Sequence, residues 1–394
     1  MNILQVTLGF YPAQSWGGPV KVVHQNGREL VRRGHRVTVY CSNLVNKHEK
    51  IAPGTFEREM DGIRIVYFEA WNIKQWPGTL GPIWLPDLPA YVRREIETFD
   101  IVHINGYRSP MILPIVSAAR KAGIPIVTQP HGALPIIVNS QTVKRLYDRV
   151  FGQAELRGIS ALIALQESER QQALAHRVPP ERIVILPNGI DPADMKQAPP
   201  PGSFRRRLGI SPEQPLILFL GRINKKKGPD MLVEAFAQIK TPAAHLVIAG
   251  PDDGQLAEVQ ALIQKHSLEG RVSLPGLVTG PEVLAAFRDS DLFVLPCRAD
   301  TFPVVMMEAC LAGTPMVITD RCEIAHLVQD QAAEVVPFDP ALFARAMQEL
   351  LTNREKYARY RANCAHLIAK TFSIHAVIDQ LEEIYHRALE EKKR

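Results

Sequence analysis

A chain of 394 residues exceeds the size at which one hydrophobic core keeps growing, so its length predicts two domains. A hydrophobic fraction of 46% excludes a disordered chain, and no run approaches the ~20 apolar residues of a membrane-spanning helix. The net charge of +5 is modest for a nucleic-acid binder, and five scattered cysteines without a C-x-x-C pair indicate neither a zinc site nor a disulfide framework.

Charge is distributed unevenly along the chain. Residues 1–190 hold roughly 22 Lys and Arg against about 15 Asp and Glu, so this half is expected to face something anionic. The first five residues lack the basic start of a secretory signal. We therefore expect a cytoplasmic protein, and the basic half leaves open a position at the inner face of the cell membrane.

Short apolar runs alternate with amphipathic segments of helical length from one end of the chain to the other. This rhythm is typical of parallel sheets with crossover helices. In the first half, the predicted strands are residues 3–8, 37–41, 63–68, 101–105, 124–128 and 161–165. In the second half, they are residues 216–220, 245–249, 272–274, 292–295, 316–318 and 333–336. The pattern predicts two doubly wound α/β domains.

The domain boundary is predicted in a proline-rich segment. Residues 187–202 contain Pro-Asn-Gly-Ile-Asp and then Ala-Pro-Pro-Pro-Gly, which propagate neither a helix nor a central strand. We therefore predict an N-terminal domain over residues 1–195 and a C-terminal domain over residues 196–373. Apolar residues at helical spacing over residues 374–394 predict a long, packed final helix.

Two loops in the first half follow predicted strands, at the carboxyl edge where open parallel sheets bind ligands. Gly17 and Gly18 precede a helix, and paired glycines let the backbone approach a phosphate closely. This loop lacks the G-x-G-x-x-G fingerprint, so a flexible loop is the alternative. His131 follows the strand over residues 124–128, although a lone histidine is more often structural.

In the second half, Gly221 ends a buried strand and a cluster of cations follows it. Arg222 offers a planar fork for phosphate oxygens, and Lys227 offers a point charge a short distance away. A diphosphate is the natural ligand for such a strand end. The alternative is a solvated basic turn.

A third loop runs from the strand over residues 292–295 into a helix that begins near Pro303. Backbone N–H groups at the start of that helix favour an anion. Asp300 precedes the helix and Glu308 lies about one and a half turns into it, so both carboxylates can face one ligand. Beside a phosphate, they would accept hydrogen bonds from sugar or ribose hydroxyls. The alternative is a helix N-cap for Asp300 and a surface position for Glu308.

Taken together, these residues resemble the retaining glycosyltransferases of the GT-B fold, in particular family 4, over essentially the whole chain. The resemblance rests on the order and spacing of these motifs: Gly17-Gly18, His131-Gly132, residues 187–191, Gly221-Arg222, Lys227-Gly228, residues 249–251, and residues 300–315. It implies two Rossmann-like domains that face each other across a cleft, with the C-terminal helix returning to the N-terminal domain. It also implies sugar transfer from a nucleotide-diphosphate sugar, either a UDP-sugar or GDP-mannose, with retention of anomeric configuration.

The resemblance also implies a role for each matching residue. Arg222 and Lys227 would hold the diphosphate and stabilise the leaving group without a divalent metal, and His131 would touch the donor sugar. Glu308 would bind the ribose hydroxyls, and Asp300 the hydroxyls of the transferred sugar. The remaining donor contacts would come largely from the backbone of Gly17, Gly18, Gly221, Leu277, Val278, Phe302, Val304 and Val305.

The chain departs from the family at two positions. Asp300 stands where the family has the first glutamate of a pair, and Pro303, which has no N–H, stands where a glycine often follows the phenylalanine. The shorter aspartate leaves open a different sugar or a different epimer. No residue of the sequence presents itself as the nucleophile of a double displacement, so we favour attack by the acceptor on the face from which the phosphate departs.

The N-terminal half is expected to hold the acceptor, a sugar or a lipid-linked saccharide, as in surface-polysaccharide assembly. Asn105, Tyr107 and Arg108 follow the strand over residues 101–105 and are candidate contacts. Residues 136–138 and 143–151 mix apolar and basic side chains at helical spacing, which suits an anionic membrane surface or a core helix with a basic face. The alternatives to a transferase are another GT-B enzyme, such as a sugar-nucleotide epimerase or a phosphorylase, and a non-catalytic nucleotide-sugar-binding subunit.

Overall fold

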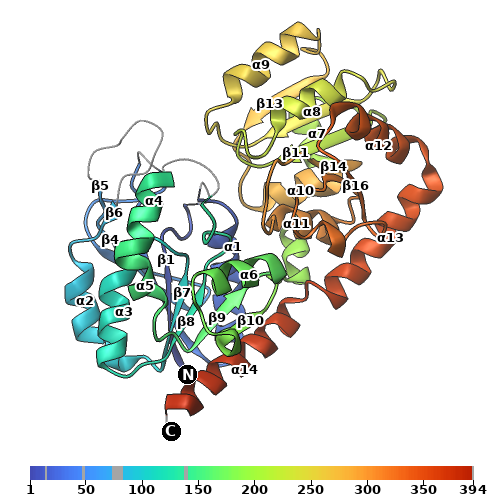
Figure 1. Cartoon of the computed structure of the whole chain (residues 1–394). Coiled ribbons are helices and arrows are strands. Elements are labelled where there is room, and N and C mark those ends of the chain that lie inside the picture. Colours follow the sequence, from blue (N-terminus) through green and yellow to red (C-terminus); the bar gives the residue numbers. More distant parts are fainter. Residues whose placement is uncertain (14–15, 47–48, 73–82, 137–140, 393–394) are drawn as a thin grey trace. The chain divides into compact units, whose positions relative to one another are not determined.

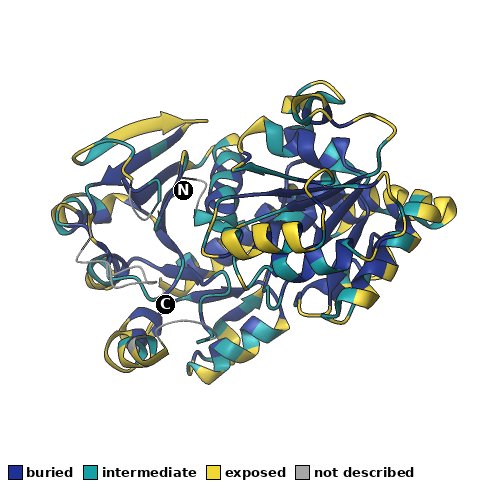
Figure 2. Ribbon diagram, turned by 90° about the horizontal axis from the view of Figure 1, so that it is seen from above, coloured by how far each residue is buried: buried dark blue, intermediate teal, exposed yellow. Residues whose placement is uncertain are grey.

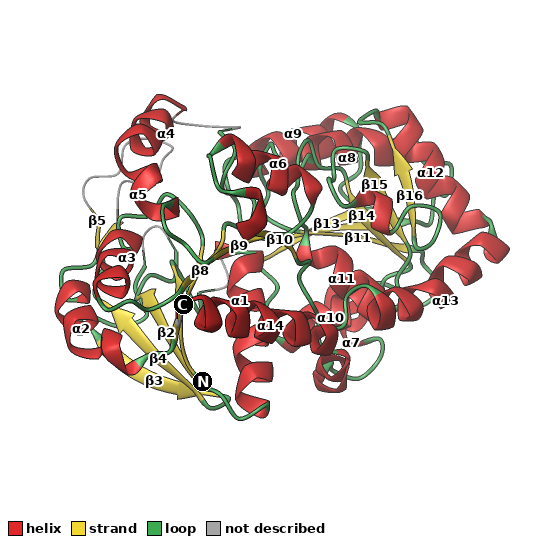
Figure 3. Ribbon diagram, turned by 60° about the horizontal axis from the view of Figure 1, so that its bottom comes forward, coloured by secondary structure: helices red, strands yellow, loops and turns green. Residues whose placement is uncertain are grey.

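The computed structural model describes residues 1–13, 16–46, 49–72, 83–136 and 141–392. The chain forms two compact units, Met1–Gly189 with Ile374–Arg394, and Ile190–Ser373. Each unit is a predominantly parallel sheet with helices on it, as the colours of Figure 3 make plain. The predicted α/β class is confirmed in both units.

The first unit is built on an eight-stranded sheet in the order β10-β9-β8-β7-β1-β2-β4-β3. Its neighbouring strands pair in parallel, except that β3 runs antiparallel to β4 at one edge. The strands are β1 (Asn2–Thr7), β2 (Arg36–Ser42), β3 (Phe56–Met60), β4 (Ile63–Phe68), β7 (Ile101–Asn105), β8 (Ile126–Gln129), β9 (Ala161–Ala164) and β10 (Ile183–Ile185). A separate antiparallel pair consists of β5 (Trp71–Asn72) and β6 (Ile83–Trp84).

The helices of this unit lie between its strands in chain order, except for α14, which ends the chain. They are α1 (Gly18–Arg32), α2 (Leu88–Glu95), α3 (Ile112–Lys121), α4 (Gln141–Tyr147), α5 (Gln153–Leu156), α6 (Glu167–Ala175) and α14 (Ile374–Lys392). Shorter turns are the 3₁₀ helices η2 (Ile96–Thr98) and η4 (Pro180–Arg182) and the π-helical turn η3 (Asp148–Gly152).

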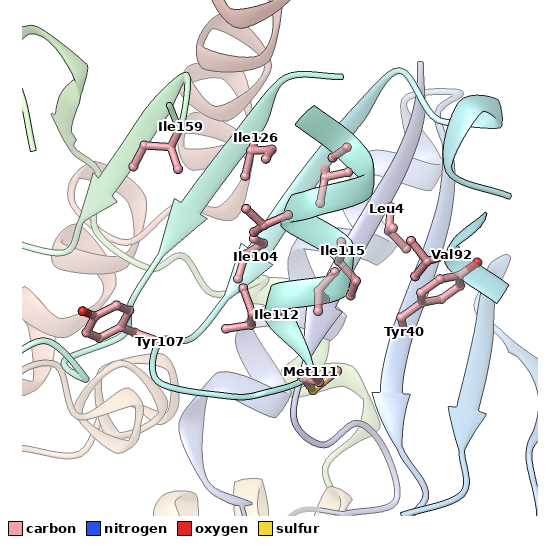
Figure 4. Packing of buried hydrophobic residues seen from close by; sticks show 14 of the residues in the cluster. Leu4, Tyr40, Val92, Ile104, Tyr107, Met111, Ile112, Ile115, Ile126 and Ile159 are labelled. Carbon is pink, nitrogen blue, oxygen red and sulfur yellow. The ribbon is translucent and has the colours of Figure 1, made fainter. Parts of the chain in front are cut away.

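Apolar side chains cover both faces of the eight-stranded sheet. On β1, Ile3 belongs to a core that includes Leu30 of α1 and Leu381 of α14. Its neighbour Leu4 belongs to the opposite core, which includes residues of α2 and α3 such as Ile115 (Figure 4). Because successive side chains of a strand point to opposite faces, a strand covered on both sides is apolar throughout. Most strands of both sheets are accordingly among the buried parts of the chain, whereas the edge strand β3 is exposed (Figure 2).

The final helix returns to the first unit. Ile378 and Leu381 of α14 are buried in the same core as α1. At the end of α1, Arg33 donates hydrogen bonds to Asp379 and Glu382 of α14, each 2.6 Å long. The predicted return of the C-terminal helix is therefore confirmed.

A buried histidine ties α14 to the sheet and makes stability depend on pH. His103 of β7 is fully buried, and its Nδ1 lies 2.7 Å from the Tyr385 hydroxyl oxygen. Burial lowers the pKa of His103 from 6.5 to about 3. As the pH falls through 6.5, this residue takes up a proton in the unfolded chain but stays neutral in the folded chain until about pH 3. The stability contributed by neutral His103 is therefore present above pH 6.5 and is lost as the pH falls toward 3.

We expect His103→Gln to weaken the decline in the free energy of unfolding between about pH 6.5 and pH 5, by up to ~1.4 kcal/mol per pH unit. Urea unfolding at a series of pH values measures this. His366→Gln alters an exposed histidine and should leave the decline unchanged. An identical pH profile in the His103 variant and the wild type would contradict the assignment.

The second unit has a six-stranded parallel sheet in the order β13-β12-β11-β14-β15-β16. Its strands are β11 (Leu216–Leu220), β12 (His245–Ala249), β13 (Val272–Gly276), β14 (Leu292–Leu295), β15 (Met316–Thr319) and β16 (Ala333–Val336). Its helices are α7 (Ser203–Leu208), α8 (Pro229–Phe236), α9 (Leu256–Lys265), α10 (Pro281–Asp289), α11 (Val304–Ala312), α12 (Pro340–Thr352) and α13 (Arg354–Lys370), with the 3₁₀ helices η5 (Pro192–Gln197) and η6 (Ala325–Leu327).

The two units divide next to a backbone contact. The N–H of Ile190 donates to the carbonyl oxygen of Phe372 over 2.8 Å, and Ile190 pairs with Ser373. Residues 190–195, which the sequence assigns to the N-terminal domain, belong to the second compact unit.

Candidate functional site

The loops after β11 and β12 meet at the carboxyl edge of the second sheet. Gly221 follows β11 and its N–H donates to the carbonyl oxygen of Ala249 over 3.0 Å. A Cβ on Gly250 would lie 1.9 Å from the carbonyl oxygen of Gly221. Only a glycine at position 250 permits this approach, so the backbone of the two loops forms the surface at this edge of the sheet.

The loop between β11 and α8 is fastened to the loop after β14. A Cβ on Gly228 would lie 2.0 Å from the carbonyl oxygen of Pro296. The N–H of Arg298 donates to the carbonyl oxygen of Lys226, and its Nη1 donates to that of Lys225, both over 2.8 Å. The same guanidinium binds both carboxylate oxygens of Asp230, at 2.8 and 2.6 Å. Such a two-pronged pair fixes geometry as well as charge.

The sequence did not single out Arg298 or Asp230. They stand 68 positions apart, and no local pattern relates them. Only the neighbouring places of β11 and β14 in the sheet bring these two residues together.

Lys227 and Asp300 contact each other where these two loops meet. The ammonium group of Lys227 donates a hydrogen bond to the carboxylate of Asp300, and the side chains are only 17% and 13% exposed. Asn224 accepts a hydrogen bond from the N–H of Lys227 over 3.1 Å. Asp300 caps no helix, because α11 begins after Pro303. The structure thus places a mostly buried cation next to a carboxylate at the carboxyl ends of the strands.

Arg222 precedes Lys227 in the same loop and is more exposed than either member of the pair. Its Nη1 donates to Asp253 over 3.0 Å, and its side chain is 47% exposed. Asn224 donates to the same carboxylate oxygen over 2.9 Å. An anionic ligand that approaches Arg222 would therefore meet a guanidinium already oriented by Asp253.

Helix α11 carries a buried carboxylate in an apolar setting. Glu308 is 5% exposed, so the alternative of a surface position is excluded. Phe302 and Val304 are also buried, and Val305 begins the first turn together with Val304. The start of this helix presents backbone N–H groups beside the Asp300 loop.

The loop after β13 holds the two residues predicted to contact a base. Gly276 has a φ of +75° and turns the chain out of the strand. Leu277 is 52% exposed, whereas Val278 is buried. This arrangement leaves the exposed Leu277 as the accessible side chain of the two.

In the first unit, the glycine pair stands at the start of α1. Gly17 has a φ of +87° and caps the helix that Gly18 begins. Residues 14–15 of the same loop lie outside the described residues. The left-handed backbone at Gly17 gives this position a conformational reason for glycine.

The side chain of His131 has a polar partner, and the backbone N–H of the next residue is hydrogen-bonded to a carboxylate. Its Nε2 lies 3.1 Å from Oδ1 of Asn105, which follows from the adjacency of β7 and β8. Burial lowers the pKa of His131 to about 4, so the ring is neutral at pH 7. Glu169 of α6, which sequence reasoning missed, accepts hydrogen bonds from the N–H groups of Gly132 (2.6 Å) and Leu165 (2.8 Å).

Tyr107 and Arg108 take part in an internal network. Arg108 donates to both carboxylate oxygens of Asp148 over 2.7 Å, and the Tyr107 hydroxyl donates to one of them over 3.1 Å. The N–H of Arg108 donates to Glu155, whose pKa burial raises to about 7. Arg108 thereby fastens η3 to the loop that follows β8, since it also donates to the carbonyl oxygen of Leu134.

The described part of the chain contains no group of three or more His, Cys, Asp or Glu side chains placed to hold a metal ion. No described helix has the length and hydropathy of a membrane span.

Two predominantly parallel α/β units of this topology define the GT-B fold. Solved structures of this fold are similar over nearly the whole chain. Anabaena HepE in complex with UDP-glucose has a TM-score of 0.77 at 20% identity over 97% of this chain and 98% of that chain. WaaG, a glycosyltransferase involved in lipopolysaccharide biosynthesis, has a TM-score of 0.71 at 19% identity, over 97% and 99%. The GT-B prediction is confirmed.

Sequence comparison gives the family. Residues 16–194 match Glycosyltransferase Family 4, and residues 202–366 match Glycosyl transferases group 1. The D-inositol 3-phosphate glycosyltransferase of Kineococcus radiotolerans is 24% identical over 95% of this chain and 92% of that protein. The chain belongs to glycosyltransferase family 4 and is a retaining glycosyltransferase.

Proposed function

We propose that this enzyme transfers a hexosyl unit from a UDP-sugar or GDP-mannose to a hydroxyl of a sugar or a lipid-linked saccharide, without a divalent metal. The observation that carries the proposal is the mostly buried Lys227–Asp300 pair, with Arg222 in the same loop as Lys227, at the carboxyl ends of the second sheet. Arg222 and Lys227 would bind the diphosphate. A pyrophosphate would compete with Asp300 for Lys227 and release that carboxylate to the sugar hydroxyls.

The roles of the remaining residues complete the proposal. Glu308 would accept hydrogen bonds from the ribose hydroxyls, and the start of α11 would donate N–H groups to the sugar and phosphates. Leu277 and Val278 would contact the base. Gly17, Gly18 and neutral His131 would contribute donor contacts from the first unit.

The reaction we propose is attack on the face from which the phosphate leaves. The acceptor hydroxyl would form its bond to the anomeric carbon as the carbon–phosphate oxygen bond breaks, and its proton would pass to the departing phosphate oxygen. Fixed positive charge stabilises the growing charge on the leaving group most strongly where water is excluded.

Relatives support the biological setting that we propose. HepE binds UDP-glucose in its solved complex, and WaaG acts in lipopolysaccharide biosynthesis. We accordingly propose surface-polysaccharide or glycoconjugate assembly at the cytoplasmic face of the membrane. Of the three proposed acceptor contacts, Tyr107 and Arg108 are engaged with Asp148, and Asn105 is buried with its Oδ1 on His131, so an acceptor would have to compete with these internal partners.

Thermal unfolding with sugar nucleotides tests the proposal. A ligand that binds only the folded chain raises its stability by about 2.7 kcal/mol at 100 times the dissociation constant. We expect a UDP-sugar or GDP-mannose to raise the melting temperature in buffer with excess chelator, and Glu308→Gln to reduce that increase. If neither nucleotide stabilises the chain, or if stabilisation requires a divalent metal, the proposal fails.

A further inference from the structure

Two exposed tryptophans stand on the small β5–β6 sheet. Trp71 lies directly opposite Trp84 across the antiparallel pair, so both side chains leave the same face. They are 60% and 47% exposed. Ile83 points to the other face and is buried in the core of the first unit. Because the large indole rings lie in water while their neighbour fills the core, this face indicates a partner.

A second exposed apolar surface lies on α4 and η3. Leu146, Val150 and Phe151 are 61%, 55% and 43% exposed. Arg145 and Arg149 alternate with them and are exposed as well. The acidic residue of this segment, Asp148, is neutralised by Arg108. The segment therefore presents apolar side chains with net positive charge, the combination found on helices that lie in a membrane interface.

Both surfaces belong to the carboxyl edge of the eight-stranded sheet. Trp71 comes three residues after β4 ends, and the N–H of Ala70 donates over 3.0 Å to Asn43, just past β2. Helix α4 follows β8, and η3 reaches the residues just past β7 through Asp148. Figures 1 and 3 both show β5 and α4 at the same end of this unit. One planar partner could thus contact both.

We infer that Trp71, Trp84, Leu146, Val150 and Phe151 form one docking surface, the apolar rim, for an anionic lipid bilayer. The indole rings suit the headgroup level, where tryptophan is enriched. Arg145 and Arg149 complement anionic headgroups. The inference deepens the proposed function and rests on its lipid-linked acceptor, because docking would bring such an acceptor to the carboxyl edge of the sheet.

The part of the earlier membrane prediction that falls on Ile137 and Val138 lies outside the described residues, and the side chain of Val143 is not described. The apolar rim therefore does not include residues 136–138. It includes instead Trp71 and Trp84, which the sequence analysis did not single out. The segment over residues 143–151 keeps its place in the inference through Leu146, Val150 and Phe151.

Cosedimentation of the full chain with phosphatidylcholine vesicles, with and without phosphatidylglycerol, tests the inference. We expect binding to the anionic vesicles and a decrease of about tenfold in partitioning for Trp71→Gln/Trp84→Gln and for Leu146→Gln/Phe151→Gln. Arg145→Gln/Arg149→Gln should reduce binding to the vesicles that contain phosphatidylglycerol and leave binding to pure phosphatidylcholine vesicles unchanged. The matched control is Leu342→Gln, which changes a 38% exposed leucine of α12 and should bind as the wild type does.

A conservative pair keeps the test independent of misfolding. Trp71→Phe/Trp84→Phe should still bind the vesicles but show less fluorescence quenching by brominated lipids than the wild type, with Trp16 and Trp76 as the remaining tryptophans. Unchanged partitioning of the Gln variants would overturn the inference. So would self-association that these variants abolish, because the rim would then belong to a second copy of the chain. Thermal stabilisation of the same variants by a sugar nucleotide, without vesicles, tests the proposed function separately.

Discussion

Lys227→Ala is expected to reduce kcat by about 10²- to 10³-fold, the loss typical of one removed donor to a developing anion. In the structure, this lysine is mostly buried and contacts Asp300. If its charge acts mainly on the departing diphosphate, its removal lowers kcat more than it raises KM. Steady-state kinetics with a sugar nucleotide and a hydroxyl acceptor measure both parameters.

Two controls separate chemistry from folding. Lys225→Ala removes an exposed cation of the same loop and leaves intact the backbone carbonyl that Arg298 binds, so we expect near-normal turnover. Lys227→Ala also leaves Asp300 without its cation, at a cost of about 1–3 kcal/mol in stability. The double variant Lys227→Ala/Asp300→Asn should recover much of that stability and none of the turnover. Near-normal rates in Lys227→Ala would remove the lysine from the proposed mechanism.

The sequence predicted the two sheets well because their strands are covered on both faces and read as continuous apolar runs. Twelve predicted strands have counterparts in the structure, although β8 begins at Ile126 rather than at residue 124. Strand β3 escaped notice because Phe56–Met60 is polar and mostly exposed at a sheet edge. The β5–β6 pair has only two residues on each strand, which is too short for any periodic signal.

The candidate site could be predicted only in its local parts. Gly221, Lys227 and Asp300 stand in contiguous motifs beside strand ends, so their neighbourhood followed from the topology expected of a parallel sheet. The hydrogen bonds that hold these loops in place could not be predicted from the sequence. Arg298 reaches Asp230, and Glu169 reaches Gly132, across gaps in sequence that carry no pattern. The internal engagement of Arg108 was likewise invisible, because its partner Asp148 lies 40 residues away.

Gly228→Ala is expected to destabilise the second unit by more than the cost of placing an alanine in a left-handed backbone conformation. Gly228 has a φ of +70°, where an L-residue costs about 1–2 kcal/mol. Its added Cβ would also lie 2.0 Å from the carbonyl oxygen of Pro296, and separating those backbones costs roughly a further 1–3 kcal/mol. Gly209 has nearly the same φ, +68°, with nothing within 4 Å of an added Cβ.

Gly209→Ala is therefore the matched control, since it carries the backbone cost alone. Calorimetric unfolding should show a larger decrease in melting temperature for Gly228→Ala than for Gly209→Ala. Because Pro296 leads to Arg298 and Asp300, the displaced loop should also move Asp300 away from Lys227 and weaken nucleotide-sugar binding. Equal losses of stability and unchanged binding in the two variants would mean that the loops after β11 and β14 are not held together by this contact. Lys227 would then be positioned by the Arg298–Asp230 pair and by the hydrogen bonds of its loop to Arg298 and Asn224.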